Sequence, residues 1–147
     1  MVVTEMRGRC LMYKSIVVGV DMAQLDRAER VLQKARTLLD TGGKIVLVNV
    51  LEELPAYLSI DIPQDLMGQA RSDATRTLLD LRQKFGLDAS IDIRQGSPAH
   101  EILACARANA ADLIILASHV PDLSNYFIGA TADRVVRHAE CSVLVDR

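Results

Sequence analysis

The chain has 147 residues, of which 50% are hydrophobic and 24% are charged, and its formal net charge is −2. This length corresponds to one domain, and the composition excludes an intrinsically disordered chain. Aromatic residues make up 3% of the chain and tryptophan is absent, which argues against a stacking surface for single-stranded nucleic acid. The weak net charge provides no basic field that would hold nucleic acid or an anionic membrane.

The start of the chain and the cysteines indicate the cellular setting. Residues 1–11 show no periodicity and contain no apolar stretch of the kind a secretory signal has. No apolar run approaches the roughly 18 residues that a membrane helix needs. The three cysteines are widely spaced, without a CxxC or other metal-ligand spacing: Cys10, Cys105 and Cys141. We therefore expect a cytoplasmic protein with reduced thiols and no metal site, with one domain over 12–147 after an unstructured extension over 1–11.

Segments rich in β-branched residues alternate with segments of helical periodicity. The expected strands cover residues 15–21, 44–50, 89–95, 112–118 and 141–146. Residues 15–21, 44–50 and 112–118 are continuous apolar runs typical of strands buried on both faces, whereas the alternation of Ile91 and Ile93 around Asp92 suits an edge strand. The expected helices carry apolar residues at steps of three and four, and they cover residues 24–41, 64–85, 98–109 and 129–139. This alternation predicts an α/β fold with a five-stranded parallel sheet in the order 3-2-1-4-5 and helices on both faces.

Local signals set the expected boundaries of these elements. Gly42 and Gly43 are expected to stop the first helix, and Ser97 to cap the third. Residues 51–63 are expected to be irregular because two prolines interrupt them. The second helix is expected to bury one apolar face, made of Leu66, Ala70, Ala74, Leu78, Leu81 and Phe85.

The predicted strand order places a ligand site at one end of the sheet. The first and fourth strands are neighbours there, and ligands of open α/β sheets bind at the carboxyl ends of the strands at such a switch point. The candidates therefore begin after Val20 and Ala117. Asp21 either accepts hydrogen bonds from a ligand or caps its own turn. The small residues at 129–131 either hold an anion at a helix N-terminus or allow the helix to pack closely.

The last strand, 141–146, is expected to form an edge of the sheet. Val143 and Val145 lie on one face of it and Leu144 on the other, and neither lysine nor proline interrupts it. An open apolar edge favours aggregation unless it is charged, covered or paired. Pairing with the same strand of a second copy around a two-fold axis would satisfy both edges.

The sequence contains no set of residues that predicts catalysis. His119 follows the fourth strand, but no other His, Cys or acidic residue is placed to complete a metal site with it. No nucleophile elbow of the form GxSxG and no phosphate-binding lysine motif occurs. We expect no catalytic residues.

Three stretches resemble one known family. Residues 12–21 (MYKSIVVGVD), 111–119 (ADLIILASH) and 137–145 (RHAECSVLV) resemble the opening strand, the fourth strand and the closing helix and strand of universal stress proteins. The similarity runs from residue 12 to 147, and the SHxPD stretch at 118–122 and the RHAECSVLV stretch at 137–145 look most like the F/G-type branch. The resemblance implies a Rossmann-like adenine-nucleotide-binding fold and a dimer.

The resemblance also implies which residues hold the nucleotide. ATP-binding members carry a loop of the form G-x2-G-x9-G-[ST] after the fourth strand, but here Ala117 and Val120 replace the first two glycines. Eight residues separate Val120 from Gly129, and Ala130 takes the position of the hydroxyl residue; the shorter loop also occurs in the F/G-type branch. Val20 and Asp21 would adjoin the adenine with Val50 as its wall, while residues 117–119 would follow the ribose and phosphates. The full set is Val20, Asp21, Val50, Ala117, Ser118, His119, Val120, Gly129, Ala130 and Thr131.

The combined expectation is a cytoplasmic stress-response protein that binds ATP, ADP or AMP, with Mg²⁺ as an accompanying ion. It would act as a nucleotide-responsive homodimer, joined through strand 141–146, with no nucleic-acid or membrane partner. Any ATPase activity would be slow because no general base for water is visible. The alternative is a family member with an empty pocket that works through protein–protein interaction. An enzyme of another nucleotide-dependent α/β family is a third reading, which no catalytic constellation supports.

Overall fold

The computed structural model describes residues 12–53, 55–59, 63–118 and 128–147. The expected extension over 1–11 lies outside the described residues. The strands are β1 (Tyr13–Gly19), β2 (Leu39–Leu51), β3 (Ala89–Gln95), β4 (Leu113–Ala117) and β5 (Ser142–Asp146). The helices are α1 (Leu25–Leu38), α2 (Ala56–Ser59), α3 (Gln64–Lys84), α4 (Pro98–Ala108) and α5 (Ala130–His138).

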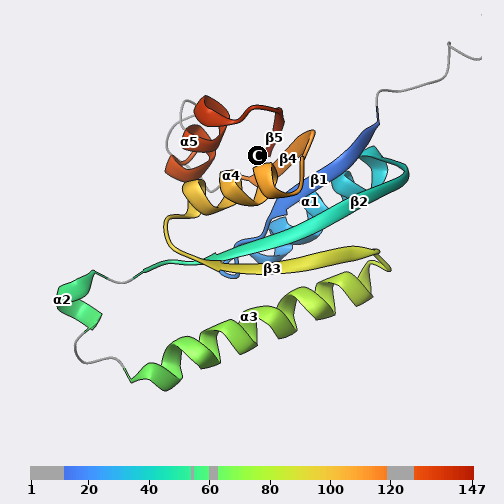
Figure 1. Cartoon of the computed structure of the whole chain (residues 1–147). Coiled ribbons are helices and arrows are strands. Elements are labelled where there is room, and N and C mark those ends of the chain that lie inside the picture. The colour runs from blue at the N-terminus through green and yellow to red at the C-terminus, as the bar shows by residue number, and fades with distance from the viewer. Residues whose placement is uncertain (1–11, 54, 60–62, 119–127) are drawn as a thin grey trace, which may run out of the picture.

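All strand pairs are parallel, and the five strands lie in the order β3-β2-β1-β4-β5 (Figure 1). This confirms the predicted α/β class and strand order. β1 occupies the centre, where Val17 lies opposite Val46 on one side and Ile114 on the other. The expected edge position of β5 is confirmed as well.

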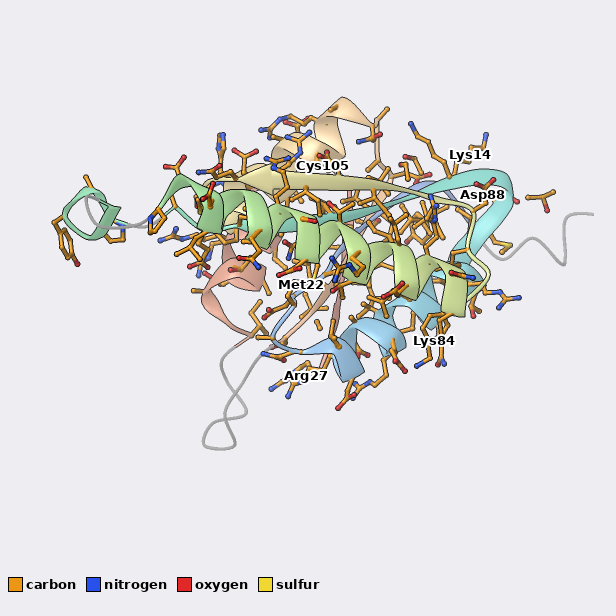
Figure 2. All side chains as sticks on the ribbon, turned by 90° about the horizontal axis from the view of Figure 1, so that it is seen from below. Lys14, Met22, Arg27, Lys84, Asp88 and Cys105 are labelled. Atoms are coloured by element: carbon orange, nitrogen blue, oxygen red, sulfur yellow. The ribbon has the colours of Figure 1, made fainter. Side chains whose placement is uncertain are left out.

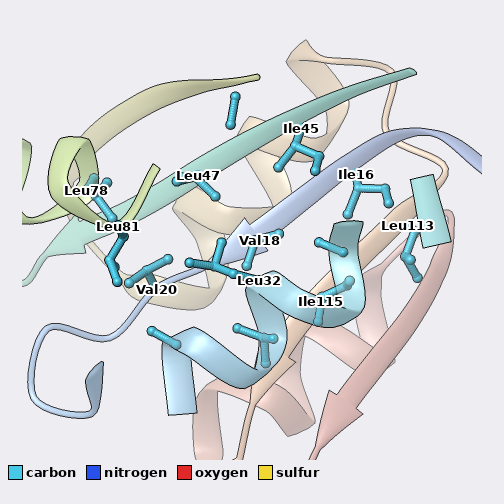
Figure 3. Close-up of a cluster of buried hydrophobic side chains, with 14 residues drawn as sticks. Ile16, Val18, Val20, Leu32, Ile45, Leu47, Leu78, Leu81, Leu113 and Ile115 are labelled. Carbon is cyan, nitrogen blue, oxygen red and sulfur yellow. The ribbon is translucent and has the colours of Figure 1, made fainter. Parts of the chain in front are cut away.

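Helices cover both faces of the sheet and bury two apolar layers. α1 and α3 lie on one face and pack on Ile16, Val18 and their neighbours, as the close-up of this cluster shows (Figure 3). α4 and α5 lie on the other face, where Val17 and Cys105 are fully buried. Burial, above all, raises the pKa of the Cys105 thiol to about 11, so the thiol is neutral at physiological pH. Cys105 is therefore a packing residue, as expected.

The boundary between α1 and β2 differs from the expectation. α1 ends at Leu38, and β2 already begins at Leu39, whose backbone is extended. Gly42 and Gly43 therefore lie inside a strand and do not stop the helix. The pairing of β1 with β2 shifts register across this segment. Gly42 has φ +77°, a conformation that favours glycine, so the two glycines accommodate a bulge.

The first turns of α3 are exposed, contrary to expectation. Leu66 is 51% exposed and Ala70 is exposed, whereas Ala74, Leu78 and Leu81 are buried. The 21 residues of α3 span about 31 Å as a helix, but the seven residues of β3 span only about 23 Å. The helix therefore overhangs the sheet near α2 (Figure 1).

Two smaller expectations are also corrected. Residues 51–63 are not wholly irregular, because they contain the single turn of α2. Ser97 stands at the N-cap position of α4, but its side chain makes no capping hydrogen bond. No helix among the described segments is long and apolar enough to span a membrane.

The outer edge of β3 is covered by arginines of α3. The amide of Gly96 donates to Leu51 O of β2. Successive residues of a strand point their amide and carbonyl groups to opposite sides. Ala89 and Ile93 are an odd number of residues from Gly96, so their amide and carbonyl groups face away from β2. Arg82 Nη1 donates to Ala89 O and Arg71 Nη1 to Ile93 O, each at 3.1 Å. Both arginines come from α3, which runs beside α1 in the view from below (Figure 2), so this edge is partly satisfied within the chain.

A buried carboxylate ties the end of β5 to α1. The side chain of Asp146 is only 3% exposed, and it bonds to Lys34 and, at 2.6 Å, to Arg30 Nη2. Burial on its own would raise the pKa of Asp146, but the bond and charge of Lys34, together with those of Arg30, outweigh it and lower the pKa. The ionised carboxylate is therefore the form that the fold stabilises.

Asp146→Asn is expected to lower the free energy of unfolding by about 1–2 kcal/mol at pH 7, because it removes a charge with two half-exposed cationic partners. Because the pKa of Asp146 is lower in the folded protein than in the unfolded chain, its carboxylate stabilises the fold at pH values above the ordinary carboxyl pKa. This stabilisation is lost as the pH falls to the pKa of Asp146 in the folded protein. The difference from the parent should therefore shrink between pH 7 and pH 3 in urea unfolding. The control Asp73→Asn removes a carboxylate 3.9 Å from Arg76 at an exposed position, and we expect almost no effect. A deficit of Asp146→Asn that stays constant with pH would contradict this account.

Candidate functional site

A cavity of about 320 Å³ lies where the carboxyl ends of β1, β2 and β4 meet the start of α5. This is the switch point of the sheet. Most of the predicted site residues line it: Val20, Asp21, Val50, Ala117, Gly129, Ala130 and Thr131. Ser118, the residue after Ala117 in the chain, is buried, and its hydroxyl donates to the carbonyl of Ile128. His119 and Val120 lie outside the described residues.

The end of β1 is fixed by backbone and side-chain hydrogen bonds. The amide of Val20 donates to Val48 O at 2.8 Å, which extends the β1–β2 pairing by one residue. Asp21 Oδ1 accepts from the amide of Ala23 at 2.9 Å, so Asp21 does cap its own turn. Asp21 also lines the cavity, and its other carboxylate oxygen has no bond within the described part of the chain. The two readings of Asp21 are therefore compatible.

Asn49 is a lining residue that the sequence reasoning missed. It is 6% exposed, and its Nδ2 donates to Val20 O at 2.9 Å. Its Oδ1 is buried and has no hydrogen-bond partner in the described structure. A buried acceptor left unpaired costs about 1–3 kcal/mol; because Oδ1 has almost no exposed surface, a ligand in the cavity does not reach it. The available signal was the single amide in the otherwise apolar strand KIVLVNV.

Close packing of strands shapes the floor of the cavity. A Cβ atom on Gly19 would lie 2.5 Å from Leu116 Cδ2 and 3.4 Å from Ile102 Cδ1. Gly19 lines the cavity together with both of these side chains. Glycine at this position therefore lets the end of β1 lie against β4 and α4 without a clash.

The segment between β4 and α5 has both of its ends held in place. Ser118 Oγ donates to Ile128 O at 2.9 Å, so the two ends lie side by side. The amide of Ser118 donates to Asp146 O at 2.7 Å, and Arg27 donates to Ser118 O. β5 and α1 thus position the entry to α5.

The start of α5 presents backbone donors to the cavity. Gly129 precedes the helix with φ +85° and ψ 148°, close to a region that only glycine occupies readily. Ala130 and Thr131 follow in the first turn, where the amides have no partner inside the helix and the helix dipole favours an anion. The small side chains leave these amides accessible.

The polar groups of the cavity are therefore segregated. Hydrogen-bond acceptors lie just after β1 and β2, on Asp21 and Glu52, and backbone donors lie at the start of α5. Apolar groups such as Val50 and Ile102 lie between them. This arrangement suits an elongated ligand with an amine at one end and an anionic group at the other. Within the described ranges, no three His, Cys, Asp or Glu side chains are grouped to hold a metal ion.

Gly129→Ala is expected to lower the free energy of unfolding by about 1–3 kcal/mol, because a side chain is strained at this φ and ψ. Gly68→Ala is the matched control, since Gly68 lies in α3 with nothing within 4 Å of an added Cβ. The control should raise stability by about 0.5–1 kcal/mol through higher helix propensity. Chemical denaturation of both variants measures the contrast, and equal effects would contradict the strained conformation.

Comparison with known proteins identifies one family over most of the chain. The family described as "Universal stress protein family" matches residues 12–147. Universal stress protein G of Shigella flexneri is 28% identical over 145 residues, which cover 92% of this chain and 100% of that protein. This similarity supports the G-type resemblance.

Solved structures share the fold. The hypothetical protein MJ0577 superposes with a TM-score of 0.74 at 22% identity, over 91% of this chain and 95% of that chain. A universal stress protein in complex with cAMP gives a TM-score of 0.62 at 19% identity, over 92% and 98% of the two chains. A universal stress protein from Archaeoglobus fulgidus in complex with dAMP gives 0.59 at 22% identity, over 92% and 99%. With the family match over residues 12–147, the chain belongs to the universal stress protein family.

Proposed function

We propose that this universal stress protein binds an adenine nucleotide in the cavity at the switch point and acts in the stress response as a nucleotide-responsive protein. The observation that carries the proposal is the segregation of polar groups, with acceptors at the ends of β1 and β2 and, at the start of α5, backbone amides that have no partner within the helix. The two fold neighbours described in complex with cAMP and dAMP support an adenine nucleotide as the class of ligand.

The proposed pose follows from the chemistry of the two ends. The base lies against Val20, Asp21 and Val50, and the phosphates accept hydrogen bonds from the amides of residues 129–131. Ala117 and Ser118 follow the ribose, and His119 and Val120 complete the proposed set. ATP, ADP and AMP are all candidates.

Mg²⁺ would accompany ATP through the phosphates. The described residues offer no acidic cluster that would hold the ion on its own, so the protein contributes the phosphate-binding amides and the ion neutralises phosphate charge. The proposed site of action is the cytoplasm, because the cysteines lack a disulfide or metal spacing.

Gly129→Glu is expected to abolish nucleotide binding, because a carboxylate beside the α5 amides would occupy the anion position and repel phosphate. Isothermal titration of the parent with ATP, ADP and AMP, with and without Mg²⁺, gives the reference affinities. Gly68→Glu adds the same charge to α3 and should bind like the parent.

Two results would overturn the proposal. One is the absence of any heat of binding or thermal shift with millimolar nucleotide in the parent, which would favour a protein that works through protein–protein interaction. The other is Gly129→Glu binding as tightly as Gly68→Glu, which would move the phosphates away from α5.

The proposed assembly is a homodimer joined through β5. Because Asp146 O accepts from the amide of Ser118, the peptide groups of Val143 and Val145 face away from β4. No side chain in the described ranges donates to them, in contrast to the arginines that cover β3. The side chains of Val143 and Val145 pack on the α4–α5 face and Leu144 on the α1–α3 face. The outward amide and carbonyl groups of β5 are therefore the groups with which a second copy would pair.

Val143→Pro is expected to shift the protein from dimer to monomer, because it removes an outward amide from the edge of β5 without removing a β4–β5 bond. Ile91→Pro is the matched control, since by the same alternation its amide faces outward on the edge that α3 covers. Light scattering at tens of micromolar reports the mass. A parent of about 16 kDa, or a dimer weakened equally by both prolines, would contradict assembly through β5.

A further inference from the structure

Ser118 is a buried serine whose amide, carbonyl and hydroxyl are all hydrogen-bonded within the chain. It directly follows β4 and is 1% exposed. Its amide donates to Asp146 O at 2.7 Å, and its carbonyl accepts from Arg27. Its hydroxyl donates to Ile128 O at 2.9 Å. The first two bonds anchor Ser118 to β5 and α1, so the hydroxyl is held at a fixed place opposite Ile128.

The carbonyl of Ile128 and the amide of Gly129 belong to one peptide group. Because a trans peptide group is planar, its C=O and its N–H point in opposite directions. The bond from Ser118 therefore also fixes the direction of the Gly129 amide, which points away from Ser118. This amide has no hydrogen-bond partner among the described residues, and it is one of the amides at 129–131 proposed to bind phosphate.

The glycine at 129 makes this peptide group easy to turn over. Such a flip changes ψ of Ile128 and φ of Gly129, and glycine accepts φ of either sign. The observed φ of Gly129 is +85°. After a flip, the carbonyl oxygen of Ile128 would point where the amide of Gly129 now points, so an acceptor would replace a donor. The bond from the Ser118 hydroxyl opposes this flip.

We propose that Ser118 is a positioning residue for the phosphate end of the bound nucleotide. Its hydroxyl holds the peptide group between Ile128 and Gly129 so that the amide, and not the carbonyl oxygen, faces the phosphate. This inference rests on the proposed nucleotide-binding function. The side chain of Ser118 is buried outside the lining of the cavity, so it acts on the phosphate through this peptide group.

AMP and adenosine separate the phosphate end from the rest of the ligand, because they differ by the phosphate alone. The parent is expected to bind AMP at least about tenfold more tightly than adenosine, since hydrogen bonds to a charged acceptor are among the stronger ones. Isothermal titration gives both affinities. A smaller folded population weakens both ligands by the same factor, so the ratio of the two affinities reports on the phosphate end and not on stability.

Ser118→Ala removes the hydroxyl and leaves Ile128 O without its donor. The affinity for adenosine is expected to stay within about twofold of that of the parent, whereas the advantage of AMP over adenosine falls to about threefold or less. Ser118→Cys, which has a weak donor of similar shape, replaces Ser118→Ala if thermal unfolding shows that the latter does not fold.

Ser15→Ala is the matched control. Ser15 is also a buried serine, with 6% exposure, and its hydroxyl also donates to a backbone carbonyl, Asn109 O, at 3.0 Å. It lies near the start of β1, at the opposite end of the sheet from the cavity. The control therefore removes the same kind of bond, and it should keep the advantage of AMP that the parent has.

Each outcome of these titrations decides the inference. An advantage of AMP that the parent and Ser15→Ala share, and that the replacement of Ser118 removes, supports it. An advantage that survives the replacement of Ser118, or that both serine variants lose equally, overturns it. A parent that binds AMP no better than adenosine overturns it as well, while binding of the base stands. A parent that binds neither ligand overturns the proposed function itself.

Discussion

The need to bury β1 on both faces organises this protein. Ile16, Val17 and Val18 are fully buried, and successive side chains of a strand point to opposite faces, so one helical layer cannot cover them. Because parallel neighbours require crossovers, the helices occupy both sides, with α1 and α3 on one and α4 and α5 on the other. The chain passes from β1 through α1 to β2 and from β4 through α5 to β5, so the two connections run to opposite sides of the β1–β4 pair. The cavity lies between them, at the carboxyl ends of these strands.

The chemistry of that cavity comes from groups that the strands and helices cannot satisfy by themselves. The start of α5 supplies amides that have no partner within the helix, and Gly129 with φ +85° directs the chain into that helix. At the other side, the carboxylates of Asp21 and Glu52 follow β1 and β2 and line the cavity. A ligand that has a donor at one end and an anionic group at the other complements these groups, and this complementarity underlies the proposed nucleotide site.

The two edges of the sheet are managed differently. Arginines from α3 bond to outward carbonyls of β3, whereas the outward peptide groups of β5 have no such cover among the described residues. The end of β5 is also connected to the site, because Asp146 bonds to Arg30 and Lys34 through its carboxylate and to the amide of Ser118 through its carbonyl. Ser118 in turn holds Ile128, just ahead of Gly129. The edge proposed for dimer formation and the end of the cavity proposed to bind the phosphates are therefore joined by hydrogen bonds.

The sequence by itself determined the class of fold, the strand order and the end of the sheet at which the cavity lies, because β-branched runs and helical periodicity are local properties that read directly as buried strands and amphipathic helices. Most of the site residues that it predicted, from Val20 to Thr131, do line the cavity, since they follow the strands at the switch point. Only the tertiary structure decided the rest. Asn49 reaches Val20 across 29 residues of sequence, and Asp146 reaches Arg30 across 116, so no local pattern specifies these bonds. Likewise, the start of β2 at Leu39 depends on pairing with Tyr13, and the exposure of Leu66 depends on where the sheet beneath α3 ends.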